Sequence, residues 1–146
     1  MGNEETATAS GPALFQVCAQ VEIRNVLARI AHASDEGSLD EYGACFTEDA
    51  RWEMPGLVVR HGRTQICQAG AERRASAIAG PGTHTRHLIS TTAVTVQGDE
   101  AVAESCWQFY VGTGERPVPA SMGTYRDTLR RTDEGWQVAE RIVRPG

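Results

Sequence analysis

The chain has 146 residues, of which 40% are hydrophobic and 23% are charged, as is ordinary for one globular domain. Its formal net charge of −5 argues against a nucleic-acid or anionic-membrane partner, because such surfaces attract basic proteins. No apolar run approaches the ~18 residues that span a bilayer, and the N-terminus lacks the basic and apolar regions of a secretory signal.

The cysteines indicate reduced thiols rather than disulfides or a metal site. They form no Cys-x-x-Cys pair, do not cluster with histidine, and lie within apolar patterns at Cys18, Cys45, Cys67 and Cys106. Buried, unpaired cysteines are typical of proteins in a reducing compartment. We therefore expect a cytoplasmic protein with four buried thiols.

The N-terminal part of the chain predicts a tail and a long helix. Residues 1–12 are small and polar, and we expect them to be loosely ordered or disordered, before one domain at 13–146. Apolar residues then recur at helical spacing over 14–33, namely at Leu14, Val17, Val21, Val26, Leu27 and Ile30. Gly37 marks the end of this helix.

Short elements follow before the pattern changes. An acidic helical turn is expected at 39–45, and a strand at 50–54 has its hairpin partner at 57–61 beyond a Pro-Gly turn. A helix with a face of small residues then runs over 62–79, with Thr64 as its expected N-cap.

The second half of the chain predicts a sheet. From residue 84 onwards the pattern has period two, with β-branched residues and Gly-containing turns, which predicts strands over 84–97, 101–112, 122–131 and 136–143. Helices followed by a run of long strands are typical of an α+β fold. We expect a strongly curved antiparallel sheet with about three helices on its concave face. Such a cone has one open end, which is a natural small-molecule site.

Several segments together resemble a known family. The stretches CFTEDARWEMPG, RHGRTQI, THTRHLIST and GTYRDTLRRTDEGWQVAER resemble the SnoaL-like branch of the nuclear-transport-factor-two-like superfamily, over about residues 14–143. This resemblance implies a cystatin-like α+β barrel. Within the branch, the spacing is most similar to the scytalone dehydratase and hexachlorocyclohexane dehydrochlorinase group.

The resemblance implies three catalytic residues. An Asp–His dyad in the cone falls on Asp35 and His87, and an arginine on the last strand falls on Arg141. Substrate-contacting positions are expected at Ile30, Trp52, Met54, Trp107, Phe109 and Tyr125. The chain departs from the group at Ile30, where the dehydrochlorinase has a lysine. It also departs at Ser34 and Met54, where scytalone dehydratase has tyrosines.

The implied chemistry is removal of a carbon-bound proton from a hydrophobic small molecule. A neutral imidazole is a suitable base near pH 7, and a carboxylate on its other nitrogen fixes the tautomer and stabilises the imidazolium. The Arg141 guanidinium stays charged and can stabilise developing negative charge. The hypothesis is a lyase or isomerase that needs no metal or other cofactor.

Each of these residues also has a structural interpretation. Asp35 can simply end the first helix, and His87 can be a hydrogen-bonded structural histidine. Arg141 can pair with Glu104 or Asp127 across the sheet. His84 and His87 are expected on opposite faces of one strand, which argues against a two-histidine metal site.

Other functions of the same fold stay open. The chain can be a non-catalytic module for small-ligand binding or assembly, or a polyketide cyclase-type enzyme. We also expect a homodimer or a higher homo-oligomer, because the outward face of one strand carries Val102, Cys106 and Tyr110, which is apolar for a monomer surface.

Overall fold

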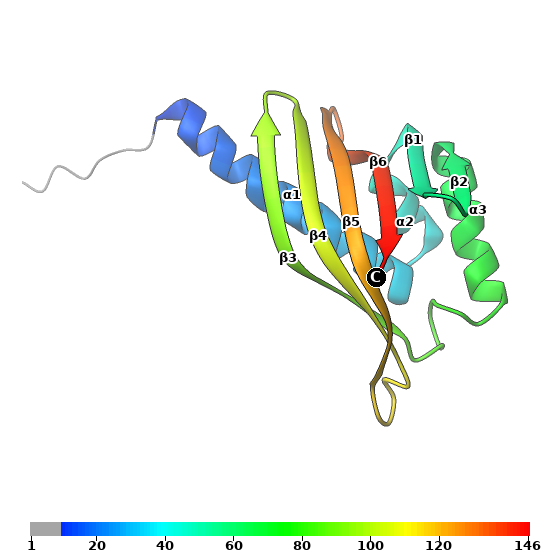
Figure 1. The fold of residues 1–146 in the computed structure, drawn as a ribbon. Coiled ribbons are helices and arrows are strands. Elements are labelled where there is room, and N and C mark those ends of the chain that lie inside the picture. Colours follow the sequence, from blue (N-terminus) through cyan, green and yellow to red (C-terminus); the bar gives the residue numbers. More distant parts are fainter. Residues whose placement is uncertain (1–9) are drawn as a thin grey trace, which may run out of the picture.

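The computed structural model describes residues 10–146, which form three helices and six strands in an α+β arrangement (Figure 1). The helices come before the four long strands, as the sequence pattern predicts. Part of the expected tail, residues 1–9, lies outside the described residues. Gly11 and Pro12 are already helical, so the expected tail over 1–12 is too long at its C-terminal end.

The first helix, α1, spans Gly11–Asp35. It begins earlier than expected because the Ser10 side chain caps it, accepting a hydrogen bond of 3.3 Å from the Ala13 N–H. Proline in the first turn costs nothing, since that N–H has no partner within the helix.

The face of α1 that enters the core is not the one that begins at Leu14. Leu14, Val17 and Val21 are 54–61% exposed. The core side chains are Ala19, Ile23, Val26, Leu27, Ile30 and Ala33. At 3.6 residues per turn, these two sets lie on roughly opposite sides of the helix, so the expected single apolar face was wrong in its first half.

Two shorter helices follow. Helix α2 spans Leu39–Ala44 and begins with a capping box between Ser38 and Glu41. Helix α3 spans Gly62–Ala75, with His61 rather than Thr64 at its N-cap.

Helix α3 ends four residues before the expected Ala79 because Ala77 adopts a left-handed conformation, with φ +53°. The Ile78 N–H donates to the Arg73 carbonyl at 2.9 Å and the Ala77 N–H to the Arg74 carbonyl at 3.0 Å. These two bonds are those of a Schellman motif, which closes a helix.

The strands form one mixed sheet in the order β2-β1-β6-β5-β4-β3. Their bounds are Phe46–Met54 for β1, Val58–His61 for β2, Arg86–Gln97 for β3, Glu100–Val111 for β4, Val118–Thr132 for β5 and Gly135–Pro145 for β6. The expectation of a purely antiparallel sheet was wrong, because β1 and β6 run parallel. The other neighbouring strands are antiparallel.

Two strand boundaries differ from expectation for identifiable reasons. Strand β1 begins at Phe46 rather than at residue 50, because Phe46 is fully buried and pairs with Val138 of β6. Strand β3 begins at Arg86 rather than at His84. His84 has φ +53°, a turn conformation that cannot continue a strand.

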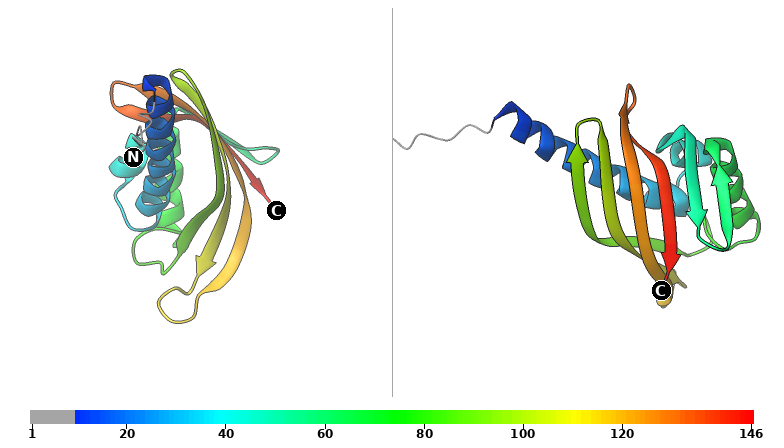
Figure 2. Two further views of the ribbon diagram at one scale, coloured as in Figure 1. Left: turned by 90° about the vertical axis from the view of Figure 1, so that its left-hand side faces the viewer. Right: turned by 45° about the horizontal axis from the view of Figure 1, so that its top comes forward.

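The sheet curves around α1, which lies across its concave face (Figure 2). The interior joins α1 to several strands through Ile23, Leu27, Phe46, Leu129 and Val138, each at most 2% exposed. Trp136 also belongs to this core. This packing leaves the C-terminal end of α1, where Asp35 lies, against the start of β3.

The four cysteines carry free thiols, but they are not uniformly buried as expected. Cys18 is exposed on α1, Cys45 is buried, and Cys67 and Cys106 are half-buried. Among residues 10–146, none of the helices is long and apolar enough to cross a membrane. The cytoplasmic location stays a prediction.

Candidate active site

A cavity of about 300 Å³ opens on the concave side of the sheet. Its lining includes the six positions at which the sequence predicts substrate contacts, namely Ile30, Trp52, Met54, Trp107, Phe109 and Tyr125. His87 and Arg141 also line it, whereas Asp35 lies behind His87. The volume is at the lower end of the range typical for small-molecule sites. Contact of these side chains with a substrate stays a prediction.

Sequence reasoning missed several polar lining residues. Tyr42 from α2, Arg73 from α3 and Ser121 from β5 also face the cavity. Tyr42 lies within an acidic helical turn and Arg73 in the last turn of a helix, so their neighbours in sequence do not indicate a cavity. Their position depends on how α2 and α3 pack, which local pattern does not report.

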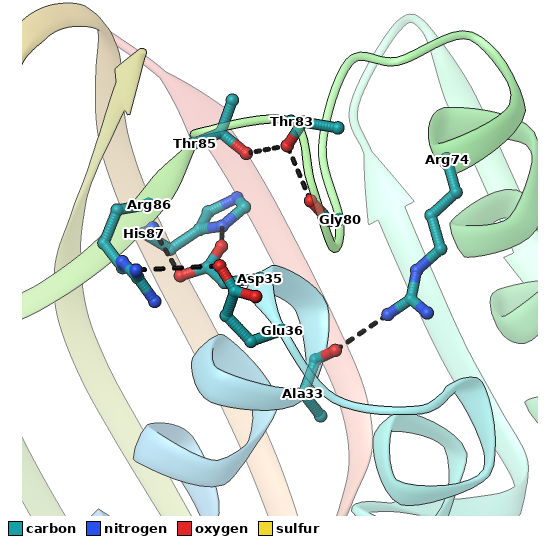
Figure 3. A network of polar contacts seen from close by, with 9 residues as sticks. All are labelled: Ala33, Asp35, Glu36, Arg74, Gly80, Thr83, Thr85, Arg86 and His87. Carbon is teal, nitrogen blue, oxygen red and sulfur yellow. Dashed lines mark hydrogen bonds and ion pairs between the residues drawn. The ribbon is translucent and has the colours of Figure 1, made fainter. Parts of the chain in front are cut away.

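Asp35 and His87 form a close two-point contact (Figure 3). His87 Nδ1 lies 2.6 Å from Asp35 Oδ1, and the His87 backbone N–H donates to Asp35 Oδ2 at 2.9 Å. The Asp35 side chain is 1% exposed, while that of His87 is 21% exposed. The carboxylate therefore holds both the ring and the backbone of His87.

This contact determines which nitrogen of His87 is free. In neutral His87, a proton on Nδ1 satisfies the carboxylate, and Nε2 then keeps its lone pair. The ring packs against Phe109, with 4.6 Å between ring centroids, and lines the cavity. The arrangement can accept a proton at Nε2 from a molecule in the cavity.

Neighbouring residues hold the segment that carries Asp35. Arg74 Nη2 donates to the Ala33 carbonyl at 2.8 Å and to the Gly37 carbonyl at 2.9 Å. These bonds tie α3 to the end of α1 on both sides of Asp35, and Figure 3 shows the contact to Ala33. An ion pair of 3.7 Å joins Glu36 to Arg86, the residues that follow Asp35 and precede His87.

Arg141 is buried and pairs with Asp127, one of the two partners considered from the sequence. Arg141 Nε donates to Asp127 Oδ1 at 2.7 Å, and Nη2 donates to Oδ2 at 2.9 Å. The other candidate, Glu104, instead accepts from Arg126 at 2.8 Å. The Arg141 guanidinium also lies 3.9 Å from the Tyr125 ring centroid.

The electrostatics keep Arg141 charged and Tyr125 neutral. Burial by itself lowers the pKa of Arg141, but attraction and hydrogen bonding from Asp127 outweigh it, so the pKa is raised. Burial raises the pKa of Tyr125 to about 12, although the Arg141 charge acts in the opposite direction. Near neutral pH the cavity therefore contains a cation and an uncharged phenol side by side.

No group of three histidine, cysteine, aspartate or glutamate side chains in the described part of the chain could hold a metal ion. His84 was expected on β3, facing away from His87. It lies instead in the preceding turn, lining a shallow recess with Gly112 and Gly114 of the loop between β4 and β5.

Comparisons with known proteins agree on the fold. A family model described as a SnoaL-like domain matches residues 15–142. A solved NTF2-like protein with a cystatin-like fold from Novosphingobium aromaticivorans has a TM-score of 0.80 at 22% identity, covering 99% of this chain and 92% of that one. A Mycobacterium tuberculosis protein of unknown function has a TM-score of 0.80 at 26% identity, covering 95% and 78%.

A proposed scytalone dehydratase, also from Novosphingobium aromaticivorans, has a TM-score of 0.74 at 20% identity, covering 89% of this chain and 85% of that one. At that identity the likeness describes the fold alone. No curated protein matches the chain.

Proposed function

The chain belongs to the SnoaL-like family, and from this membership and the site we propose that it is a cofactor-independent lyase or isomerase, similar to a dehydratase. Its reaction would remove a carbon-bound proton from a hydrophobic small molecule. The observation that carries the proposal is the contact of 2.6 Å between Asp35 and His87, with His87 lining the cavity.

His87 is the proposed base. Its Nε2 would take a proton from a carbon next to an activating group, and the electron pair of the broken C–H bond would move into that group. Asp35 would stabilise the imidazolium that forms. The imidazolium would then return the proton to a departing oxygen in an elimination, or to another carbon in an isomerisation. Such a positioned base contributes roughly 10²–10⁴-fold to a rate.

Arg141 is the proposed electrostatic partner. Its Nε and Nη2 are occupied by Asp127, which leaves Nη1 as the nitrogen for a substrate oxygen. Because Asp127 fixes the guanidinium plane, Nη1 would need no reorganisation to meet developing negative charge. The Asp127 charge also offsets that of Arg141, so its role would be that of an oriented donor.

The same ion pair favours a second candidate function. Arg141 and Asp127 are 4% and 0% exposed, and a fork-to-fork contact of this kind also occurs as a purely structural element. If that is its role, the cavity would bind an apolar ligand without transforming it.

Deuterium exchange distinguishes the two functions. We would incubate 1-tetralone, 2-tetralone and 4-chromanone, which are apolar ketones with removable α-protons, in D₂O and follow loss of the C–H signals by NMR. The protein should accelerate exchange of at least one ketone, and His87→Ala should abolish the effect. His61→Ala, an exposed histidine that does not line the cavity, is the matched control. Exchange at the buffer rate for all three ketones would contradict catalysis.

The same assay tests whether Asp35 and His87 act together. Asp35→Asn should slow exchange on the order of 10³–10⁴-fold, as when a histidine is held in the wrong tautomer. An asparagine amide can donate to Nδ1, which leaves the proton on Nε2 and removes the base. The double variant should be little slower than either single variant, because the pair acts as a unit. Multiplicative losses would show that the two residues act separately.

We also propose that the chain forms a homodimer through the outer face of the sheet. Val102, Cys106 and Tyr110 on this face are half-buried in the single chain. Leu88 and Met122 both pair with Gln108, which alternates onto the same face as Cys106, so Leu88 and Met122 also lie on the outer face. They are 45% and 54% exposed.

A further inference from the structure

The cavity contains a second arginine, Arg73, which differs from Arg141 in having no anionic partner among residues 10–146. Arg73 lies in the last turn of α3 and lines the cavity. It also lines a small adjoining recess, together with Ser34 and Tyr42. Its guanidinium makes neither a hydrogen bond nor an ion pair with the rest of the described residues. Its neighbour Arg74, in contrast, donates through Nη2 to the carbonyls of Ala33 and Gly37.

The charge balance of the cavity follows from this difference. Of the lining residues within 10–146, none is an aspartate or a glutamate. The charge of Arg141 is offset by the bidentate contact with Asp127 behind the wall. Among the cavity-lining arginines of the described residues, Arg73 is therefore the one whose guanidinium has no carboxylate in contact, in a cavity whose other walls are mostly apolar or aromatic.

Helix geometry alone accounts for only part of this arrangement. A basic residue in the last turn of a helix interacts favourably with the helix dipole, and Arg73 and Arg74 both have that position. That interaction is satisfied equally by a side chain that points to solvent. It does not explain why Arg73 is half-buried at the cavity.

We propose that Arg73 binds a carboxylate on the substrate, and that the substrate is an apolar, ring-containing carboxylic acid. The carboxylate would pair with the planar guanidinium, which suits that group better than an ammonium does. The apolar body of the substrate would contact the aromatic walls of the cavity, and its reactive C–H would lie at His87 on β3. The binding role of Arg73 is independent of catalysis, whereas the direction of the C–H towards His87 rests on the proposed function.

A pair of probes that differ in charge tests this role. 2-Naphthoate and 2-naphthamide have nearly the same shape, and their binding can be followed through quenching of Trp52 and Trp107, which line the cavity. The protein should bind the carboxylate about tenfold or more tighter than the amide, as expected for a charge-assisted contact. Arg73→Gln should bring the two affinities to within about threefold of each other. The small preference for the carboxylate that is left would come from the oriented donor of Arg141.

Three further variants make the outcome decisive. Arg73→Lys should keep most of the preference, because it retains the charge. Arg24→Gln removes the same charge from an exposed position on α1 that does not line the cavity, and should change nothing. His87→Ala should also keep the preference for 2-naphthoate over 2-naphthamide. If the original protein shows this preference but does not accelerate deuterium exchange of the ketones, the proposed function is contradicted and the role of Arg73 stands. An unchanged ratio in folded Arg73→Gln, or no preference in the original protein, would overturn the role of Arg73.

Discussion

Buried Asp127 and Arg141 form a cluster with half-buried Tyr125 at the wall of the cavity. Two charges in the interior are tolerated here because two parallel hydrogen bonds join them and an aromatic face covers the guanidinium. Removal of one partner from such a pair typically costs ~3–5 kcal/mol, because the other charge is left buried and unpaired. Arg141 therefore contributes to stability whatever its role in a reaction.

Tyr125 makes the stability of this cluster depend on pH. Its folded pKa of about 12 lies above the value near 10 of an unfolded tyrosine, so the folded protein keeps a proton that the unfolded chain releases. The contribution of Tyr125 to the free energy of unfolding is therefore complete below pH 10 and is lost as the pH rises towards 12. At pH 11 the loss should be about 1 kcal/mol. Urea unfolding at pH 9, 10 and 11 measures this loss. Tyr125→Phe should lack this part of the decline, and equal declines in both proteins would refute the assignment.

At the scale of elements, β5 approaches β4 and β6 closely at Gly123. A Cβ atom added there would lie 2.7 Å from the Trp107 ring and would collide with the Arg144 carbonyl oxygen. Trp107 lines the cavity and stacks on Tyr125, with 5.9 Å between ring centroids. The absence of a side chain at residue 123 thus sets the position of an aromatic wall.

Gly123→Ala should destabilise the protein by roughly 1–3 kcal/mol, as overpacking of a tight interior does. Gly11→Ala is the control, because no atom lies within 4 Å of the added Cβ and alanine favours a helix. Thermal unfolding of both variants gives the comparison. An equal melting temperature for Gly123→Ala and the original protein would show that the backbone relaxes without cost.

Local patterns predict the order of elements but not how their faces are used. The change from helical spacing to period two correctly separates the helices from the four long strands. The apolar side chains of Leu14, Val17 and Val21 have helical spacing, yet the sheet packs against the opposite side of α1. The parallel pairing of β1 with β6 is equally invisible, since no local signal joins strands so far apart in sequence.

The candidate site shows the same division. Asp35 and His87 are 52 residues apart, and their pairing was expected because of a family resemblance and not because of spacing. Asp127 was one of two open partners for Arg141, and the register of β5 with β6 decides between them. Arg73 was missed because consecutive basic residues at a helix end are already explained by the helix dipole.

At the scale of the whole molecule, the outer sheet face is the proposed dimer interface. The sheet pleat places exposed Leu88 and Met122 and half-buried Cys106 on one side, and exposed apolar patches on a protein surface mark contact sites. Two copies related by a two-fold axis would cover the same patch on each other.

Light scattering should therefore give about twice the 15.8 kDa mass of one chain at micromolar concentration. Leu88→Glu combined with Met122→Glu should restore the single-chain mass, because paired carboxylates would face each other across the interface. Leu57→Glu, at a 75% exposed position between β1 and β2, should leave the dimer intact. A monomeric original protein would rule out the interface.

The position of β6 also has a consequence for how the chain folds during synthesis. Although β6 is the sixth strand in the sequence, it lies between β1 and β5 in the sheet. Until β6 has been synthesised, the β1–β2 hairpin and the β3–β5 meander have no strand in common. The edges of β1 and β5 that later pair with β6 are then unpaired. The nascent chain can therefore close its cavity only after β6 has been synthesised, when Arg141 reaches its place beside Asp127.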